Sequence, residues 1–406
     1  MRRRVLHELP PTAGLPLRIA DLVPGRAALS ETAAAQLGTP PLLLTCSGTV
    51  ALMVALRTLS ERAPRRRVVV VPAYTCPLVA IAVHRLGLQL RLCDTRPGHF
   101  DMAPDALAEA CRDDTLAVVP THLAGLVADV DTACDIAWGR GAFVIEDAAQ
   151  ALGASDRGQS VALRGDAGFF SLAAGKGLSI YEGGLLAARD ATLRDALRRT
   201  HDAMAPHDRG WELRRTVALA ALALAYRPSG LALAYGLPLR RHLLRGDPVS
   251  AVGDRFGPDI PIHRVGHWRQ GVGTRAAARW PAFLAERRAL ACRRVARLQR
   301  IAGLDVLTPR EEAQGSWPVL LLRLADEARR DAVLERLWSI GVGVSRMFVH
   351  ALPDYSYLAD RVPREPMPNA RDFARRTLTV TNSPWLDDAT FERIAFVIES
   401  VLERGA

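Results

Sequence analysis

Lysine is almost absent from this chain of 406 residues. Of its 53 Lys and Arg residues, 52 are arginine, and Lys176 is the single lysine. Arginine replaces lysine well on a protein surface, but its guanidinium stays protonated, whereas an ε-amine loses its proton and attacks a carbonyl. A chain that uses arginine everywhere else therefore makes Lys176 a candidate chemical lysine.

Long apolar runs and paired cysteines are also missing. No uninterrupted apolar stretch reaches the roughly 18 to 20 residues of a membrane-spanning helix, and no apolar segment follows Arg2-Arg3-Arg4 as it does in a secretion signal. The six cysteines form no CxxC pair, and no histidine lies at zinc-finger spacing from them. We therefore expect free thiols, no metal site and a cytoplasmic protein.

The remaining composition is that of a folded globular protein, with 49% hydrophobic and 24% charged residues. It excludes a disordered, collagen-like or small disulfide-rich chain. The formal net charge is +10, but the basic tracts Arg2-Arg3-Arg4 and Arg65-Arg66-Arg67 are short and carry no interleaved aromatics. Nucleic-acid binding requires basic residues clustered on one face, so no nucleic-acid partner is expected.

Between residues 47 and 190, short apolar runs alternate with helical patterns. Val68 to Val71 is a continuous apolar run, which is typical of a strand buried on both faces. Such alternation predicts right-handed βαβ crossovers and a mostly parallel sheet, with ligands beyond the carboxyl ends of the strands. We expect strands at 68–71, 88–93, 116–119, 143–145 and 185–187, and helices at 49–62, 77–85, 105–112 and 133–138.

The alternation stops near residue 201, which divides the chain. We predict an α/β large domain at 1–200, a helical insert at 201–265 and a smaller α+β domain at 266–406. The insert holds two apolar stretches, 217–226 and 231–239, and arginines flank both. For the segment 216–239 two interpretations stay open: a buried helical hairpin, or a helical pair that contacts an anionic membrane surface.

Two segments carry candidate groups for binding an aromatic phosphate cofactor. Ser47-Gly48-Thr49 directly precedes a helix, where free N–H groups and hydroxyls bind phosphate. An ordinary helix cap is the alternative. Glu146-Asp147-Ala148-Ala149-Gln150 follows a strand, and a carboxylate there can keep a pyridine nitrogen protonated, which makes the ring an electron sink.

Two further segments surround the lone lysine. In Ser171-Leu172-Ala173-Ala174-Gly175-Lys176-Gly177, glycines leave space around the amine for an aldehyde, and Ser171 is placed to contact a phosphate. Tyr181-Glu182-Gly183-Gly184 is a tight turn into the next strand. A surface lysine on a glycine turn is the alternative interpretation of the first segment.

In this order, these motifs resemble the DegT/StrS-type aminotransferases, pyridoxal-phosphate enzymes that aminate keto sugars on nucleotides. The resemblance covers about 47–190 and returns weakly at Pro368-Asn369-Ala370 and Thr381-Asn382-Ser383-Pro384. It rests on Ser47-Gly48-Thr49, Val71-Pro72-Ala73-Tyr74-Thr75, Thr121-His122-Leu123-Ala124-Gly125, Glu146-Asp147-Ala148-Ala149-Gln150, Phe170-Ser171, Lys176 and Glu182-Gly183-Gly184.

The resemblance implies a fold type I enzyme that works as a homodimer with pyridoxal 5'-phosphate. Lys176 is then the Schiff-base lysine, Asp147 the partner of the pyridinium nitrogen and Gln150 the contact of the phenolic oxygen. The phosphate is then bound by Ser47, Gly48, Thr49 and Ser171.

Two positions depart from the family pattern. Cys76 stands where an aromatic usually covers the pyridine ring, and Tyr74 is the candidate substitute. The family also supplies an asparagine from the partner subunit to the phosphate, but the only asparagines here are Asn369 and Asn382. An Arg or His from 201–275 is the expected replacement.

The resemblance therefore implies the transfer of an amino group, with glutamate as donor, to a keto sugar carried on a nucleotide diphosphate. The alternatives are a cofactor-binding regulatory or non-catalytic protein and a related sugar dehydratase. The dehydratases of this family carry His in place of the lysine, and Lys176 argues against that branch.

Overall fold

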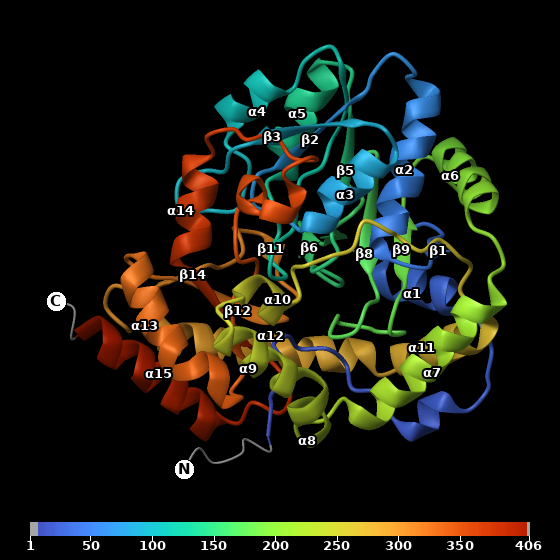
Figure 1. The fold of residues 1–406 in the computed structure, drawn as a ribbon. Helices are drawn as coiled ribbons and strands as arrows, with labels where there is room; N and C mark the ends of the chain where they lie inside the picture. Colours follow the sequence, from blue (N-terminus) through green and yellow to red (C-terminus); the bar gives the residue numbers. More distant parts are fainter. Residues whose placement is uncertain (1–6, 404–406) are drawn as a thin grey trace.

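The computed structural model describes residues 7–403, so the tract Arg2-Arg3-Arg4 lies outside the described residues. A seven-stranded sheet of order β1-β9-β8-β5-β4-β2-β3 forms its centre (Figure 1). Its strands are β1 (Leu43–Thr45), β2 (Val68–Pro72), β3 (Gln89–Cys93), β4 (Thr115–Val118), β5 (Phe143–Asp147), β8 (Ala167–Ser171) and β9 (Gly184–Ala187). Only β9 runs against its neighbours, β8 and β1. The expected α/β class with a mostly parallel sheet is confirmed.

The helices between these strands lie where the hydrophobic periodicity predicts them. Residues 68–71 are at most 2% exposed, as expected of a central strand covered on both faces. Pro77 is the first residue of the following helix, because its fixed φ suits that position and its missing N–H has no helical partner to lose. The helices of this part are α1 (Leu29–Leu37), α2 (Gly48–Arg62), α3 (Pro77–Arg85), α4 (Pro104–Ala110), α5 (Val130–Gly139) and α6 (Ala191–Met204), with the 3₁₀ turn η1 (Ile19–Leu22).

A second, antiparallel sheet lies in the C-terminal part, in the order β10-β12-β14-β13. It consists of β10 (Asp305–Val306), β12 (Val319–Arg323), β13 (Val344–Ser345) and β14 (Thr377–Thr381), with α13 (Glu327–Leu337), α14 (Pro368–Arg376) and α15 (Asp388–Glu403). Short 3₁₀ turns are η3 (Trp338–Ile340), η4 (Leu352–Asp354) and η5 (Ser356–Leu358). This is the α+β arrangement predicted for the C-terminal region.

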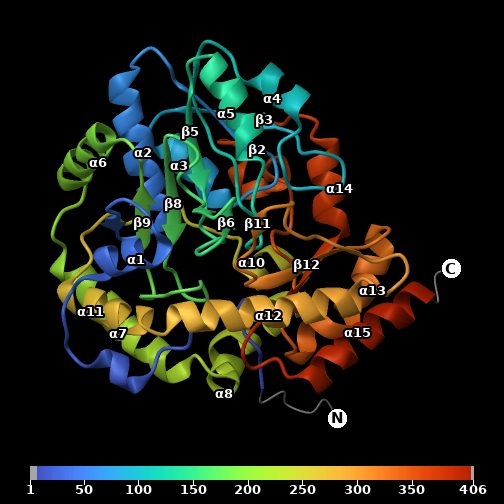
Figure 2. The same ribbon diagram turned by 180° about the vertical axis from the view of Figure 1, so that it is seen from behind.

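Two features connect the parts of the chain. The strand β11 (Ala313–Gln314) pairs with β6 (Ser155–Asp156), which also pairs with β7 (Gln159–Ser160). The long helix α12 (Trp280–Leu298) follows α11 (His267–Ala277) and runs beneath the central sheet toward α13 and α15, as both views show (Figures 1 and 2). On α12, Arg287 and Arg294 are buried and donate to Asn382 at 3.0 and 2.8 Å. The boundaries predicted at 200 and 265 stay predictions.

Residues 209–252 are mostly helical, whereas 253–265 form no helix. The helical residues form α7 (Arg209–Ala225), α8 (Pro228–Leu231), the π-helical turn η2 (Ala232–Gly236), α9 (Leu237–Leu244) and α10 (Pro248–Val252). Within residues 7–403, no single helix is long and apolar enough to cross a membrane. The pair Arg209–Ala225 and Pro228–Leu244 meets that criterion jointly, but the pair is bent by 116°.

Candidate active site

Lys176 lies in the loop after β8, between Gly175 and Gly177. Gly175 has φ +79°, a left-handed conformation that a side chain would strain. Burial lowers the pKa of the Lys176 amine, and the nearby Cys76 and Asp147 oppose that shift. A buried amine is more easily neutral, which is the form a nucleophile needs.

Asp147 is the last residue of β5, on the strand next to β8. The two strands are parallel, and Asp147 pairs in register with Phe169. One carboxylate oxygen accepts the N–H of Ala149 at 3.0 Å. Burial raises the pKa of Asp147, whereas the hydrogen bond from the Ala149 N–H and the nearby Lys176 lower it. A cationic ring nitrogen held at this carboxylate would lower the pKa further and stabilise the ion.

The start of α2 forms a small cradle against the end of β8. Ser47 caps the helix, and its hydroxyl accepts the N–H of Val50 at 3.1 Å. Among the described residues nothing accepts the N–H groups of Gly48 and Thr49. A Cβ on Gly48 would stand only 3.3 Å from the Cβ of Ser171, so this glycine keeps the cradle open. Two free N–H groups at a helix start, beside hydroxyls, make a phosphate site.

The strand β9 packs just as closely against the cradle. A Cβ on Gly184 would lie 2.5 Å from the carbonyl oxygen of Ser47. Gly184 pairs with Ser171 on one side and with Thr45 on the other. The Gly183-Gly184 turn, noted in the sequence as a tight turn, therefore lets β9 pass beneath the helix start.

We expect Gly48→Ala to weaken cofactor binding by roughly 10-fold or more, because the added methyl group intrudes between the free N–H groups and Ser171. Titration of the purified variant with pyridoxal phosphate, followed by visible absorbance, measures the dissociation constant. Gly139→Ala is the matched control, since a Cβ there meets nothing within 4 Å. Equal affinities of Gly48→Ala and the wild type would contradict the assignment of the cradle.

Gln150 and Lys176 line one cavity. The side-chain oxygen of Gln150 accepts the N–H of Ala124 at 2.8 Å, which leaves its amide N–H₂ free to donate. The cavity is closed by residues from the N-terminal segment, α12 and the C-terminal part of the chain. Its walls include Thr12, Ala13, Gln150, Lys176, Trp280, Phe283, Leu284, Ser316 and Met347.

Tyr74 and Cys76 follow β2 and occupy different places. Tyr74 is buried, donates to the carbonyl of Phe348 at 3.1 Å and accepts its N–H at 3.2 Å. Within the described chain the Tyr74 hydroxyl makes no hydrogen bond to Lys176 or Asp147. The Cys76 thiol is the group in electrostatic reach of Asp147 and Lys176; burial raises its pKa to about 12, so it is neutral. A small neutral thiol therefore stands near the lysine where an aromatic was expected.

Sequence reasoning assigned no role to His122, which hydrogen-bonds to Glu146, the residue before Asp147. Its Nδ1 accepts the N–H of Ala128 at 3.0 Å, so its Nε2 carries the proton and donates to Glu146 at 3.0 Å. Glu146 also accepts three N–H groups, from Ala162, Arg164 and Gly165, at 2.6 to 2.8 Å. Glu146 is thus a structural carboxylate, and Asp147 is the one left for chemistry.

The N-terminal segment 12–15 was also missed, because nothing in its composition signals a role. The Thr12 hydroxyl donates to the carbonyl of Gly175 at 2.7 Å, and the Leu15 N–H donates to that of Gly177 at 3.2 Å. This segment, called the strap below, therefore fastens the loop on both sides of Lys176.

Both asparagines of the chain have structural partners. The Asn369 side chain donates to Thr95 at 2.8 Å. The Asn382 amide donates to Arg287 and Trp317 at 2.9 and 3.0 Å. Within residues 7–403 neither side chain hydrogen-bonds to the cradle.

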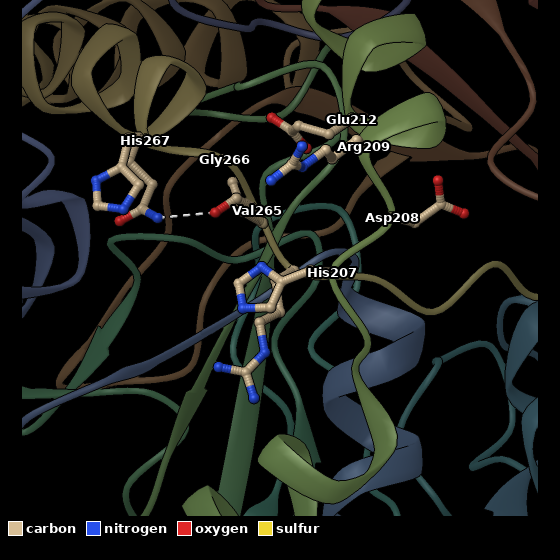
Figure 3. Close-up of a pocket in the computed structure, with 9 residues that line it drawn as sticks. His207, Asp208, Arg209, Glu212, Val265, Gly266 and His267 are labelled. Carbon is tan, nitrogen blue, oxygen red and sulfur yellow. Dashed lines mark hydrogen bonds between the residues drawn. The ribbon is translucent and has the colours of Figure 1, made fainter.

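Four of the Arg and His residues of 201–275 line an open surface pocket instead. Figure 3 shows His207, Arg209 and His267 around it, with Glu212 beside Arg209. Arg264 also lines it, but donates to Ala205 at 2.9 Å. This pocket lies outside the cavity of Lys176 and shares no lining residue with it.

A buried arginine ties this region to the turn before β9. Arg269 donates to the carbonyl of Glu182 at 2.6 Å and forms a two-bond pair with Glu212 at 2.6 and 2.8 Å. His263 lies within 3.3 Å of Arg269. Burial lowers the pKa of His263 to about 4, Arg269 adds to this effect, and Glu212 opposes it.

His263 therefore gives the fold a defined pH dependence. In the unfolded chain the histidine titrates near 6.5, so between about pH 6.5 and 4 the unfolded state binds more protons. The free energy of unfolding then falls as the pH decreases through this window. We expect His263→Gln to reduce that slope in denaturant titrations, whereas the exposed control His207→Gln leaves it unchanged. Identical slopes for His263→Gln and the wild type would show that His263 titrates normally.

Together these groups fit pyridoxal phosphate: a cradle with two free N–H groups, a carboxylate at the end of β5, and an amine with a lowered pKa. Among residues 7–403 no cluster of three or more His, Cys, Asp or Glu side chains is arranged to hold a metal ion.

Sequence comparison finds relatives whose names describe aminotransferases. The chain is 36% identical over 163 residues to a putative L-glutamine:3-amino-2,3-dideoxy-scyllo-inosose aminotransferase of Streptomyces kanamyceticus, covering 40% of this chain and 38% of the relative. It is 39% identical over 153 residues to the UDP-N-acetyl-3-dehydro-alpha-D-glucosamine 3-aminotransferase of Acidithiobacillus ferrooxidans, covering 37% and 41%. The match to protein MosB of Rhizobium meliloti is 40% over 152 residues, covering 37% and 30%. The aligned region thus spans 30% to 41% of these relatives.

Solved structures share the fold over nearly the whole chain. The putative sugar aminotransferase Spr1654 of Streptococcus pneumoniae, in its PLP form, has a TM-score of 0.73 at 18% identity and covers 98% of this chain and 100% of its own. DesI, in the presence of its TDP-sugar product, has a TM-score of 0.73 at 22% identity, with 98% and 95% covered. These similarities confirm fold type I.

The model of the DegT/DnrJ/EryC1/StrS aminotransferase family matches residues 23–223 and 270–400, well over half of the chain. This confirms the resemblance seen in the motifs, and the chain belongs to the DegT/DnrJ/EryC1/StrS aminotransferase family.

Proposed function

We propose that the chain is an aminotransferase that moves an amino group from glutamate to a keto sugar carried on a nucleotide. One arrangement supports this most: the Lys176 amine, with a pKa lowered by burial, lies in reach of Asp147 and opens on the cavity that Gln150 lines. A neutral amine beside a buried carboxylate is the pair that this chemistry requires.

Pyridoxal phosphate is the cofactor that the family indicates; when bound, it supplies an aldehyde and a ring that accepts electrons. In our proposal Ser47, Gly48, Thr49 and Ser171 hold its phosphate, and Asp147 keeps a proton on the ring nitrogen. Gln150 donates to the phenolic oxygen. Lys176 takes and returns the proton at the substrate carbon, for which a lowered pKa suits it. Tyr74 braces the end of β2 from outside the cavity.

The substrates are proposed from the names of relatives. One is named for a UDP-linked sugar, and DesI was crystallised with a TDP-sugar product, which supports a nucleotide-linked acceptor. Four others are named for L-glutamine as the donor, so glutamine is the donor to test against glutamate.

The test is a half-reaction. The purified protein, loaded with pyridoxal phosphate, is mixed with glutamate, glutamine or aspartate, and the visible absorbance is followed. Bleaching by glutamate supports the proposal, and bleaching by glutamine alone changes the donor. Cofactor binding with no bleaching by any amino acid would favour the regulatory alternative. A keto-sugar nucleotide that restores the absorbance then identifies the acceptor, whereas loss of a hydroxyl from the sugar without nitrogen transfer would indicate the dehydratase.

The expected partners and location complete the proposal. We propose a homodimer in which His207, Arg209, Arg264 or His267 supplies the phosphate contact that asparagine gives elsewhere; their gathering at one pocket supports this. Light scattering of the purified protein measures the oligomeric state. All six cysteines are free, which supports the cytoplasm. The segment 216–239 is proposed to contact a membrane surface.

A further inference from the structure

Exposed large hydrophobic side chains are concentrated on the bent pair α7–α9. Of the eleven that the described chain exposes, six lie between residues 213 and 244. Their exposed fractions run from 40% to 72%. They are Leu213, Val217, Leu224, Leu233, Leu237 and Leu244, called the hairpin face below.

The spacing places these side chains on the outer side of both helices. Leu213, Val217 and Leu224 are four and seven residues apart, which is one face of an α-helix. The opposite side of α7 buries Leu219 and Ala223 in the protein. The segment 216–239 is therefore neither wholly core nor wholly surface: each helix has one buried and one exposed apolar side.

The charge around the hairpin face is predominantly positive. Residues 208–247 contain seven arginines and three acidic residues, Asp208, Glu212 and Asp247. Glu212 forms an ion pair with the buried Arg269. Five of these arginines are exposed: Arg209, Arg214, Arg227, Arg241 and Arg245.

The combination of exposed apolar side chains and arginines distinguishes between two partners that could cover the hairpin face. A second copy would meet the hairpin face through a two-fold interface, which brings together the same patch of both copies and therefore two patches of net positive charge. An anionic bilayer instead offers phosphates to the arginines and acyl chains to the leucines. The 116° bend fits two helices that lie in the plane of the surface better than a straight span.

The inner side of the pair reaches the catalytic loop. Tyr226, at the end of α7, donates to the carbonyl of Thr12 in the strap at 3.4 Å. A Cβ on Gly14 would lie 3.0 Å from the Tyr226 hydroxyl and 2.9 Å from the Lys176 carbonyl. At this point only the strap therefore lies between the helix pair and the Lys176 loop.

We propose that the hairpin face docks on an anionic bilayer surface and holds the Lys176 cavity beside the lipid headgroups. The docking is peripheral: leucines enter the headgroup boundary, and arginines bind lipid phosphates. This deepens the membrane contact proposed above for the segment 216–239 and does not depend on the aminotransferase activity.

Co-sedimentation tests the docking. The protein loaded with pyridoxal phosphate is spun with vesicles of phosphatidylcholine alone or mixed with phosphatidylglycerol. We expect pelleting only with phosphatidylglycerol, and less of it at high salt. The double variant Leu233→Glu/Leu244→Glu should stay in the supernatant, whereas Phe396→Glu, at an equally exposed residue of α15, should pellet like the wild type.

The arginines are tested separately. Arg241→Ala/Arg245→Ala should weaken binding to phosphatidylglycerol vesicles roughly 30-fold, and Arg375→Ala on α14, which is also exposed, should not. No pelleting of the wild type at low salt would overturn the proposal. Equal pelleting of the Leu233 and Phe396 variants would overturn it too, as would dissociation of a dimer by Leu233→Glu/Leu244→Glu, because a second copy would then cover the face.

Discussion

Lys176→Arg should abolish the visible absorbance of bound cofactor and reduce turnover on the order of 1000-fold or more, while circular dichroism shows an intact fold. Arginine keeps the positive charge and most of the length, but it never becomes the neutral nucleophile that the lowered pKa of Lys176 provides. The loss therefore reports the chemistry of the amine and not its charge.

Borohydride treatment gives a second measurement. It should fix the cofactor mass on the wild-type chain and on Arg375→Lys, once in each case, and not on Lys176→Arg. The added lysine of Arg375→Lys is exposed and lacks the cradle, so it controls for unspecific labelling. Transamination by Lys176→Arg at near the wild-type rate would refute the assignment.

Asp147→Asn should still bind cofactor but lose activity on the order of 100-fold or more. The amide keeps the shape and the hydrogen bond with the Ala149 N–H, yet it removes the negative charge that holds a proton on the ring nitrogen. Without that proton the ring withdraws electrons poorly.

Rates of the glutamate half-reaction and cofactor affinity, measured together, separate this effect from misfolding. Asp166→Asn is a useful comparison, since this carboxylate accepts hydrogen bonds from Val144 and Trp138 and, among the described residues, none from Lys176. Unchanged turnover in Asp147→Asn would assign the role to another group.

The parallel strands and their helices were predictable because each follows from local periodicity. The helix predicted at 77–85 is α3, residue for residue, since Pro77 fixes its start and its apolar side has one consistent period. The strand β8 was not predicted, although Ser171 ends it. A Cβ on Gly168 would lie 2.4 Å from Ala162, so the strand needs a glycine here because of a tertiary contact. The local sequence does not reveal that contact.

The residues of the candidate site also fall into those that the sequence could predict and those that it could not. Gly48 and Asp147 were proposed because one begins a helix and the other follows a strand. Lys176 was proposed because it is the single lysine, and Ser171 because it lies in the same segment. The place of Tyr74 was not predictable, because only the folded C-terminal part brings Phe348 to its hydroxyl. The strap was invisible for the same reason: its partners lie more than 160 residues away along the chain.

Because of the strap and the single lysine, one proteolytic cut can report how often the loop around Lys176 opens. A protease that cuts only after lysine has one site in the whole chain, and that bond joins Lys176 to Gly177. A backbone segment must break its hydrogen bonds before it can enter the active site of a protease. Here Thr12 and Leu15 form hydrogen bonds with the residues on both sides of Lys176. When the strap closes faster than the protease cuts, the rate of this one cut under native conditions measures the equilibrium between the closed and the lifted strap.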